Sequence, residues 1–352
     1  MKKILRWLTI VWSLIGLLAW FGTRLDPRAF WIPSIFGPVY LWLLVGSVLL
    51  VLLLAYLREW RTALFPLVFL LISWTAIGNL FAWPDPPPPA ATAAHPALTV
   101  LTTNMRQYRD ATNGTVETAQ FTKFFNLRPA QLMLLQEARY PSKYFLAALD
   151  SLSASGRGTY TYREKTLTLA VISDYPLRYV HREVGDNNYN GFLILDLLRP
   201  TDTIRLVNAH LRTNAITGMA ERVTTEGRLD EEDTWRTVKA IFGRYGRSAG
   251  LRAKQAAQIE RLVKDSPYPV LLAGDFNDVP AGYVYRRLHR TFPVDAWLAR
   301  GRGLGVTFNG SLPGLRIDYI LADSSFRVHE VDKFDNGFSD HQTLWAEVSI
   351  GH

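Results

Sequence analysis

Three uncharged apolar stretches near the N-terminus limit what this chain can fold into. A transmembrane helix needs about 20 apolar residues, within a range of about 17–25, and each stretch is long enough to meet that length. The sequence therefore predicts three transmembrane helices, at about residues 7–23, 37–57 and 63–83. The uncharged stretches themselves are Trp7–Thr23, Phe30–Leu57 and Thr62–Pro84.

The first stretch has a second interpretation. A start with Lys2 and Lys3 followed by an apolar segment is typical of a secretory signal peptide. Two more apolar stretches follow closely, however, and no cleavage site of small residues is evident after the first. These features favour a membrane helix over a cleaved signal.

The basic residues in the short loops predict the orientation of these helices. Loops on the cytoplasmic side carry an excess of Lys and Arg. One side of the membrane would hold five such residues and the other side only Arg24 and Arg28. The N-terminus is therefore expected in the cytoplasm, and three crossings place everything after Trp83 outside it, in a multi-pass protein of the cytoplasmic membrane. The five are Lys2, Lys3, Arg6, Arg58 and Arg61.

A proline-rich segment follows the last apolar stretch. It reads PDPPPPAATAAHP from Pro84 to Pro96, and consecutive prolines favour an extended, semi-rigid spacer. We therefore expect three parts: a membrane anchor at 1–83, a linker at 84–97 and a catalytic domain at 98–352.

Composition excludes several classes of site. The chain has no cysteine, which excludes a disulfide framework, a thiol nucleophile and a cysteine-based zinc site. The formal net charge is +8. Residues 98–352 hold 32 Lys and Arg against 28 Asp and Glu, so the predicted soluble part is only mildly basic. This argues weakly against a dedicated DNA-binding surface, because affinity for the phosphate backbone normally needs clustered basic residues.

From Ala97 onward, short apolar segments alternate with amphipathic ones. This pattern predicts an α/β domain. Helices are expected at Thr115–Phe125, within Glu221–Leu262 and near Val284–Leu288. Strands are expected at ALTVLTTN, AQLMLLQEA, LTLAVIS, GFLILDLL, TIRLVNAHL, PVLLAGDFND, RIDYILAD and HQTLWAEVSI.

Polar residues of similar chemistry stand at the ends of several predicted strands. A single such residue is an ordinary cap, but six sites are hard to explain by turns alone. Ligand sites in open α/β folds gather where strands end, so these side chains are expected to converge. They are Asn104, Glu137, Asn208 with His210, Asp275 with Asn277, Asp318, and Asp340 with His341.

The residue types suit metal-assisted attack of water on phosphorus. A carboxylate such as Glu137 is a hard oxygen ligand, and Mg²⁺ prefers one or two carboxylates with waters and phosphate oxygens. His210 and His341 are candidates for proton transfer, with Asp318 a possible partner that fixes a tautomer. The amide of Asn277 can donate to a phosphate oxygen.

These segments resemble the motifs of the endonuclease/exonuclease/phosphatase superfamily, in order, over roughly residues 98–350. That superfamily includes deoxyribonuclease I, exonuclease III and the neutral sphingomyelinases. Each motif alone is weak, but six in order are specific. The segments are LTTNMR, LLQEAR, NAHLRT, AGDFND, RIDYIL and SDHQTL.

The resemblance implies a four-layer α/β sandwich of two face-to-face sheets flanked by helices. It implies that Glu137, with Asn104 and Asp340, holds Mg²⁺ or Mn²⁺. It also implies catalytic roles for five further residues: Asp275 positions the attacking water, Asn277 and His210 hold phosphate oxygens, and Asp318 and His341 orient the phosphate or act as the base.

Fold and chemistry do not name the substrate. The membrane anchor and the mild charge favour a phosphodiesterase or phosphatase acting on phosphate esters, including lipid head groups, outside the cytoplasm. The alternative is a membrane-anchored nuclease acting on DNA or RNA, for which Tyr245–Lys254 offers basic and aromatic residues. A binding module without activity is disfavoured by the intact set of acids and histidines.

Overall fold

The computed structural model separates into two compact units, each of which we describe by itself. The structure describes residues 2–83, 86, 88–92, 95–108, 118–139, 142–164, 168–185, 189–214, 223, 232–310 and 312–351. The first unit comprises Met1–Phe81, Asn214–Lys254 and Asp278–Arg286, and the second comprises Ala82–Thr213, Gln255–Asn277 and Arg287–His352.

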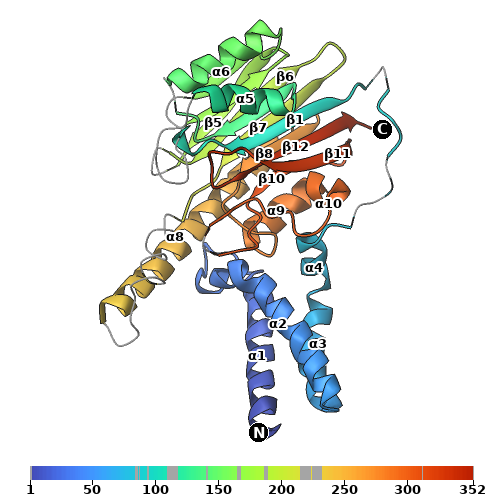
Figure 1. Ribbon diagram of the computed structural model, residues 1–352, viewed down its shortest axis with the longest axis vertical. Helices are drawn as coiled ribbons and strands as arrows, with labels where there is room; N and C mark the ends of the chain where they lie inside the picture. The colour runs from blue at the N-terminus through green and yellow to red at the C-terminus, as the bar shows by residue number, and fades with distance from the viewer. Residues whose placement is uncertain are drawn as a thin grey trace. The chain divides into compact units, whose positions relative to one another are not determined.

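The N-terminal apolar stretches form helices (Figure 1). Two are long and apolar enough to cross a membrane: α1 (Lys2–Gly22) and the segment Ile32–Tyr56, most of which is α2 (Phe36–Tyr56). The third expected helix is broken into α3 (Trp60–Ile72) and α4 (Trp74–Leu80), which meet at a 59° bend and make a third span only if the pair is counted as one.

The break between α3 and α4 has a local cause. The carbonyl oxygen of Ile72 accepts a hydrogen bond from Nε1 of Trp20 at 2.7 Å, and the hydroxyl of Ser73 lies 2.8 Å from that of Tyr40. Side chains that enter the backbone ladder of a helix in this way are a usual cause of kinks. The third span expected at 63–83 is thus a bent pair of helices, and its count as one membrane crossing stays a prediction.

Glycines allow aromatic side chains to pack between the bundle helices. A Cβ on Gly46 would lie 2.3 Å from the ring of Trp12, and one on Gly16 would lie 2.9 Å from that of Phe69. Small residues commonly bring membrane helices together in this way. Many apolar side chains point outward, among them Leu49 at 61% exposure, as expected of helices that face lipid.

Two segments from much later in the chain belong to the same unit as these helices. One is the first part of α8 (Glu232–Val263), where the Tyr245 hydroxyl donates to the carbonyl oxygen of Ser34 at 3.2 Å. In the other, the Tyr283 hydroxyl donates to Oδ2 of Asp26 at 3.1 Å. The contacts thus group parts of the expected catalytic domain with the expected anchor, and the boundaries at 83 and 97 stay a prediction.

The second unit contains two six-stranded sheets. Their strand orders are β11-β12-β1-β2-β4-β3 and β5-β6-β7-β8-β10-β9. The strands of the first sheet are β1 (Leu98–Asn104), β2 (Leu132–Gln136), β3 (Tyr160–Glu164), β4 (Leu169–Ser173), β11 (Phe326–Asp335) and β12 (Gln342–Ile350). Those of the second are β5 (Leu177–Val184), β6 (Gly191–Leu198), β7 (Thr203–His210), β8 (Val270–Asp275), β9 (Val294–Asp295) and β10 (Asp318–Ala322).

Successive side chains of the central strands enter two different cores. In β2, Leu132 and Leu134 pack in a cluster shared with β7 and β8, whereas Met133 and Leu135 pack in a cluster on the opposite face of the sheet. Side chains of a strand alternate between its faces, so the first cluster fills the space between the sheets. A central strand buried on both faces appears in the sequence as a continuous apolar run.

Helices cover the sheets on their outer sides. On the first sheet, the helices α5 (Thr118–Leu127) and α6 (Lys143–Ala154) contribute Phe124, Phe145 and Leu152 to the outer cluster. The remaining helices are α9 (Tyr283–Thr291) and α10 (Ala296–Arg300). The predicted four-layer α/β sandwich is confirmed.

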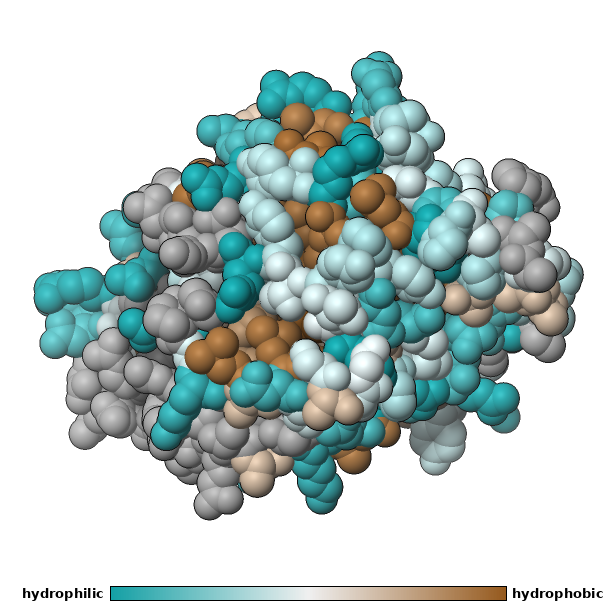
Figure 2. Space-filling view, turned by 90° about the horizontal axis from the view of Figure 1, so that it is seen from above, coloured by the Kyte–Doolittle hydropathy of each residue, from teal (hydrophilic) through white to brown (hydrophobic). Residues whose placement is uncertain are grey.

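One face of the molecule carries mostly polar residues (Figure 2). The apolar patches that Figure 2 shows on this face are small and separated from one another. Such a surface is ordinary for a domain in contact with water.

Candidate active site

Strand register brings the expected polar residues to one end of each sheet. In the first sheet, Asn104 at the end of β1 is aligned with Gln136 of the parallel strand β2. In the second, Asp275 at the end of β8 is aligned with His210 of parallel β7 and with Asp318 of antiparallel β10. The ends of parallel strands and the start of an antiparallel neighbour lie at the same edge, so these side chains converge.

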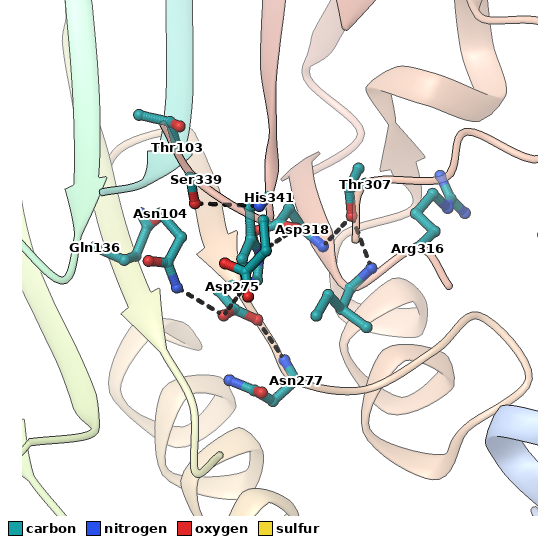
Figure 3. Close-up of polar contacts among 12 residues, drawn as sticks. Thr103, Asn104, Gln136, Asp275, Asn277, Thr307, Arg316, Asp318, Ser339 and His341 are labelled. Carbon is teal, nitrogen blue, oxygen red and sulfur yellow. Dashed lines mark hydrogen bonds and ion pairs between the residues drawn. The ribbon is translucent and has the colours of Figure 1, made fainter. Parts of the chain in front are cut away.

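The Asp275 carboxylate joins the two sheets at this edge (Figure 3). Its Oδ2 accepts a hydrogen bond from Nδ2 of Asn104 at 3.1 Å. The same oxygen lies 3.8 Å from Nε2 of His210 and 3.9 Å from Nε2 of His341. Its Oδ1 accepts the backbone N–H of Asn277 at 2.8 Å, so both oxygens of this buried carboxylate are held in place.

His341 and Asp318 form a close pair beside Asp275. Nδ1 of His341 lies 2.9 Å and 3.1 Å from the two carboxylate oxygens of Asp318. Burial lowers the pKa of His341, but the nearby carboxylates of Asp318 and Asp275 more than offset this and raise it to about 10. Burial and the neighbouring Asp318 raise the pKa of Asp275 to about 6. At neutral pH the imidazole is therefore positively charged between two acids.

The backbone is strained where the strands end. Glu137 and Asn277 have φ angles of 52° and 50°, in the left-handed region that non-glycine residues rarely adopt. Each follows a strand end directly or within two residues, and such conformations persist where the surrounding structure holds them, often at functional sites. In this conformation, Glu137 and Asn277 both lie at the sheet edge that carries Asp275.

Two of the three residues expected to bind metal are linked to Asp275 by the hydrogen bonds of Asn104, and the third is paired with an arginine. Nδ2 of Asn104 also donates to Oε1 of Glu137 at 3.1 Å, and that oxygen lies 3.7 Å from Nε2 of His210. The carboxylate of Asp340 instead pairs with Arg106, with Oδ1 and Nε 3.8 Å apart. The structure therefore brings Glu137 and Asn104 to Asp275, whereas the carboxylate of Asp340 lies against Arg106.

A second group of side chains can also hold a metal ion. Asp275, Asp318 and His341 each offer a ligand atom, and these atoms lie within 4.8 Å of one another. Carboxylates suit hard divalent cations, and a cation bound by this group would replace the proton of His341 as the positive charge beside Asp275. The residues present therefore fit a divalent metal, and the division of ligands between this group and Glu137, Asn104 and Asp340 stays a prediction.

Sequence reasoning missed two polar residues around the site. The amide of Gln136 donates to Oδ1 of Asn208 at 2.7 Å, and the Asn208 amide donates to the carbonyl oxygens of Leu135 and Ala170 at 3.2 Å and 3.1 Å. Asn208 was expected as a site residue, but here it ties the two sheets together. Gln136 is the last residue of β2, and sequence reasoning passed over it because the neighbouring Glu137 is the expected polar residue at that strand end.

Tyr189 is the second missed residue. Its hydroxyl accepts a hydrogen bond from Nε2 of Gln107 at 2.9 Å, and its ring packs edge-on against His210 with centroids 5.4 Å apart. Burial and the Glu137 carboxylate raise the pKa of Tyr189, so its hydroxyl stays protonated near that acid. It precedes β6 in a turn with no recognisable motif.

We expect Asn208→Ala to weaken the fold rather than the chemistry. The substitution removes three buried hydrogen bonds, each of which contributes about 1 kcal/mol, so the free energy of unfolding should fall by about 3 kcal/mol. Thermal unfolding of the purified protein measures this. The matched control is Asn126→Ala on exposed α5, where a change within about 0.5 kcal/mol is expected. Loss of turnover without loss of stability would contradict the structural role.

A family model now identifies this arrangement. A model of the endonuclease/exonuclease/phosphatase family matches residues 88–341. The chain belongs to the endonuclease/exonuclease/phosphatase family. A second model, of a domain of unknown function, matches residues 2–80. The comparison with curated protein sequences gave no match.

Solved structures share the fold of this family member. An endonuclease/exonuclease/phosphatase from Beutenbergia cavernae is 17% identical, with 72% of each chain covered and a TM-score of 0.51. Sphingomyelinase C from Streptomyces griseocarneus is 16% identical, with 72% of this chain and 99% of that one covered and a TM-score of 0.42. At these identities the likeness is one of fold. The chain thus has the family's phosphoesterase fold with a buried Asp–His cluster at the strand ends.

Proposed function

We propose that this protein is a divalent-metal-dependent hydrolase of phosphate esters, held at the outer face of the cytoplasmic membrane. The observation that carries the proposal is the position of Asp275, whose Oδ2 lies within 3.1–3.9 Å of Asn104, His210 and His341. A buried carboxylate between two histidines, beside a second Asp–His pair, can orient a water molecule for attack on phosphorus.

The metal would be Mg²⁺ or Mn²⁺, held by carboxylates at this edge. Glu137, Asn104 and Asp340 are the expected ligands, and Asp275, Asp318 and His341 form the neighbouring group that fits one. When bound, the ion neutralises phosphate charge and makes a bound water more acidic.

The remaining roles belong to the side chains. Asp275 orients the attacking water and accepts its proton. The charged imidazole of His341, held by Asp318, donates to a phosphate oxygen or to the leaving group. The amide of Asn277 donates one N–H to the carbonyl oxygen of Leu211 at 3.1 Å, which leaves a second N–H for phosphate. Nε2 of His210 faces the same space.

Contacts within the first unit support the predicted side of the membrane. The connection between α1 and α2 contains Asp26 and Ser34, which receive hydrogen bonds from Tyr283 and Tyr245. Those tyrosines must therefore lie on the side opposite the N-terminus. Only an odd number of crossings puts the chain after α4 on that side, which favours counting α3 and α4 as one span. With the N-terminus cytoplasmic by its basic residues, the catalytic part is extracytoplasmic.

The structure also bears on the choice between a small or lipid ester and a nucleic acid. The segment Tyr245–Lys254, considered above as a basic and aromatic surface, has Tyr245 and Arg252 buried. Nη1 of Arg252 donates to Oδ1 of Asn214 at 2.7 Å, and its guanidinium faces the Tyr245 ring at 5.5 Å. One of the three basic residues in this segment is thus used inside the protein, which argues against a continuous nucleic-acid surface there and favours the phosphate-ester substrate.

A substrate comparison tests this function. Full-length protein in nanodiscs with Mg²⁺ is given a soluble phosphodiester, a lipid phosphodiester and plasmid DNA. We expect turnover of one or both esters, intact plasmid, and loss of ester turnover on addition of EDTA. Fast plasmid cleavage with steep inhibition by salt would make the protein a nuclease, and turnover that EDTA leaves unchanged would contradict the metal dependence.

A further inference from the structure

The first half of α8 exposes large aromatic side chains. Trp235 is 57% exposed and Phe242 is 44% exposed. Seven residues separate them, so they lie on the same face of the helix. Both belong to the compact unit that contains α1–α4.

The same face of α8 continues into contact with the chain that joins α1 to α2. Gly246 follows Phe242 by one turn, and a Cβ there would lie 2.0 Å from the ring of Trp31. One turn further on, a Cβ on Gly250 would lie 3.5 Å from the carbonyl oxygen of Pro27. Because this connection links the outer ends of two membrane-spanning helices, the aromatic face begins at the membrane surface.

Basic residues accompany the aromatic ones. Between residues 232 and 247, four exposed basic side chains stand against two acidic ones, Glu232 and Asp233, which both pair with the first of the four. Aromatic residues with flanking Lys and Arg are typical of helices that lie in the interface of an anionic bilayer. The basic residues are Arg236, Lys239, Arg244 and Arg247.

We propose that the first half of α8 lies in the head-group layer of the membrane that α1–α4 span. Phe242 and Trp235 enter the interface, and Lys239, about 60° around the helix from Phe242, faces the phosphates of anionic lipids. The contact of Gly246 with Trp31 fixes the helix at that depth. This inference rests on the membrane location proposed above and is independent of catalysis.

Because the chain has no cysteine, a single introduced cysteine is the only thiol available for a spin label. Phe242→Cys and Ala240→Cys each place a single label, and the two positions lie about 200° apart around the helix. Full-length protein with a nitroxide at either site is placed in nanodiscs of phosphatidylcholine with phosphatidylglycerol. We expect the label at 242 to be accessible to oxygen and shielded from a water-soluble nickel chelate, and the label at 240 to show the reverse. Equal exposure of both labels to nickel would overturn the proposal.

Two further variants separate the possible failures. A label at Leu49→Cys, on the lipid-facing surface of α2, reports whether the bundle is inserted at all. If that label is exposed to nickel, the membrane location itself is wrong; if it is shielded while the label at 242 is not, only this inference fails. Adding Lys239→Glu to Phe242→Cys should increase nickel exposure at 242 in discs with phosphatidylglycerol. An unchanged exposure would overturn the role of anionic lipid.

Discussion

Asp275→Asn should reduce phosphoester hydrolysis by about 10³-fold, the middle of the range of about 10²–10⁴-fold for loss of a positioned acid–base group. The substitution keeps the shape of the side chain but removes its charge. The variant therefore lacks the negatively charged oxygen that lies 3.1–3.9 Å from Nδ2 of Asn104 and from Nε2 of His210 and His341. The measurement is the initial rate with a soluble phosphodiester at saturating Mg²⁺.

The same variant should fold as well as the natural protein when EDTA has removed metal. Burial raises the pKa of Asp275 to about 6, because the charged carboxylate is less stable there than in water. A neutral amide does not carry this free-energy penalty. Asp150→Asn, at an exposed site on α6, is the matched control and should change neither rate nor melting temperature. Retention of more than a tenth of the rate by Asp275→Asn would contradict the role assigned to this carboxylate.

Gly274→Ala should destabilise the second unit severely. The φ angle of Gly274 is 137°, and a Cβ there would lie 2.0 Å from the carbonyl oxygen of Ala209. That oxygen belongs to the backbone of β7, which is aligned with Gly274 in the parallel pairing of β7 and β8, so it cannot swing aside. We expect the free energy of unfolding to fall by at least about 3 kcal/mol.

Gly303→Ala is the control for this effect. Gly303 also has a positive φ, 74°, but no heavy atom lies within 4 Å of the position of its Cβ. Backbone strain alone should cost about 1 kcal/mol there. Thermal unfolding followed by tryptophan fluorescence compares the two variants. Equal shifts in melting temperature would show that the contact with Ala209 is not what requires glycine at 274.

The sequence indicated which polar residues converge better than it indicated the elements around them. Residues such as Asp275 and His210 were recognisable because each ends a long apolar run and stands in a motif. Strands β3, β5, β9 and β11 were not expected, and all four lie on sheet edges. In β5, for example, every position is partly or fully exposed. A half-exposed edge strand carries little of the hydrophobic signal on which sequence reasoning depends.

Contacts between distant parts of the chain could not be predicted from the sequence, for a different reason. Gln136 and Asn208 are 72 residues apart, and nothing in either neighbourhood indicates that their amides meet between two sheets. The same holds for Tyr283 and Asp26, which are 257 residues apart. Periodicity describes one element at a time, whereas these pairings follow from how complete elements pack.

The grouping of Asp278–Arg286 with α1–α4 has a practical consequence. This segment begins directly after Asn277, and Ala281 within it packs in the same cluster as Tyr40 and Phe69 of the bundle. A truncated protein that starts after the proline-rich segment would therefore leave Ala281 without the helices against which it packs. The N-terminal helices thus help to fold a later part of the chain, so they cannot be exchanged for other helices without redesign of that contact.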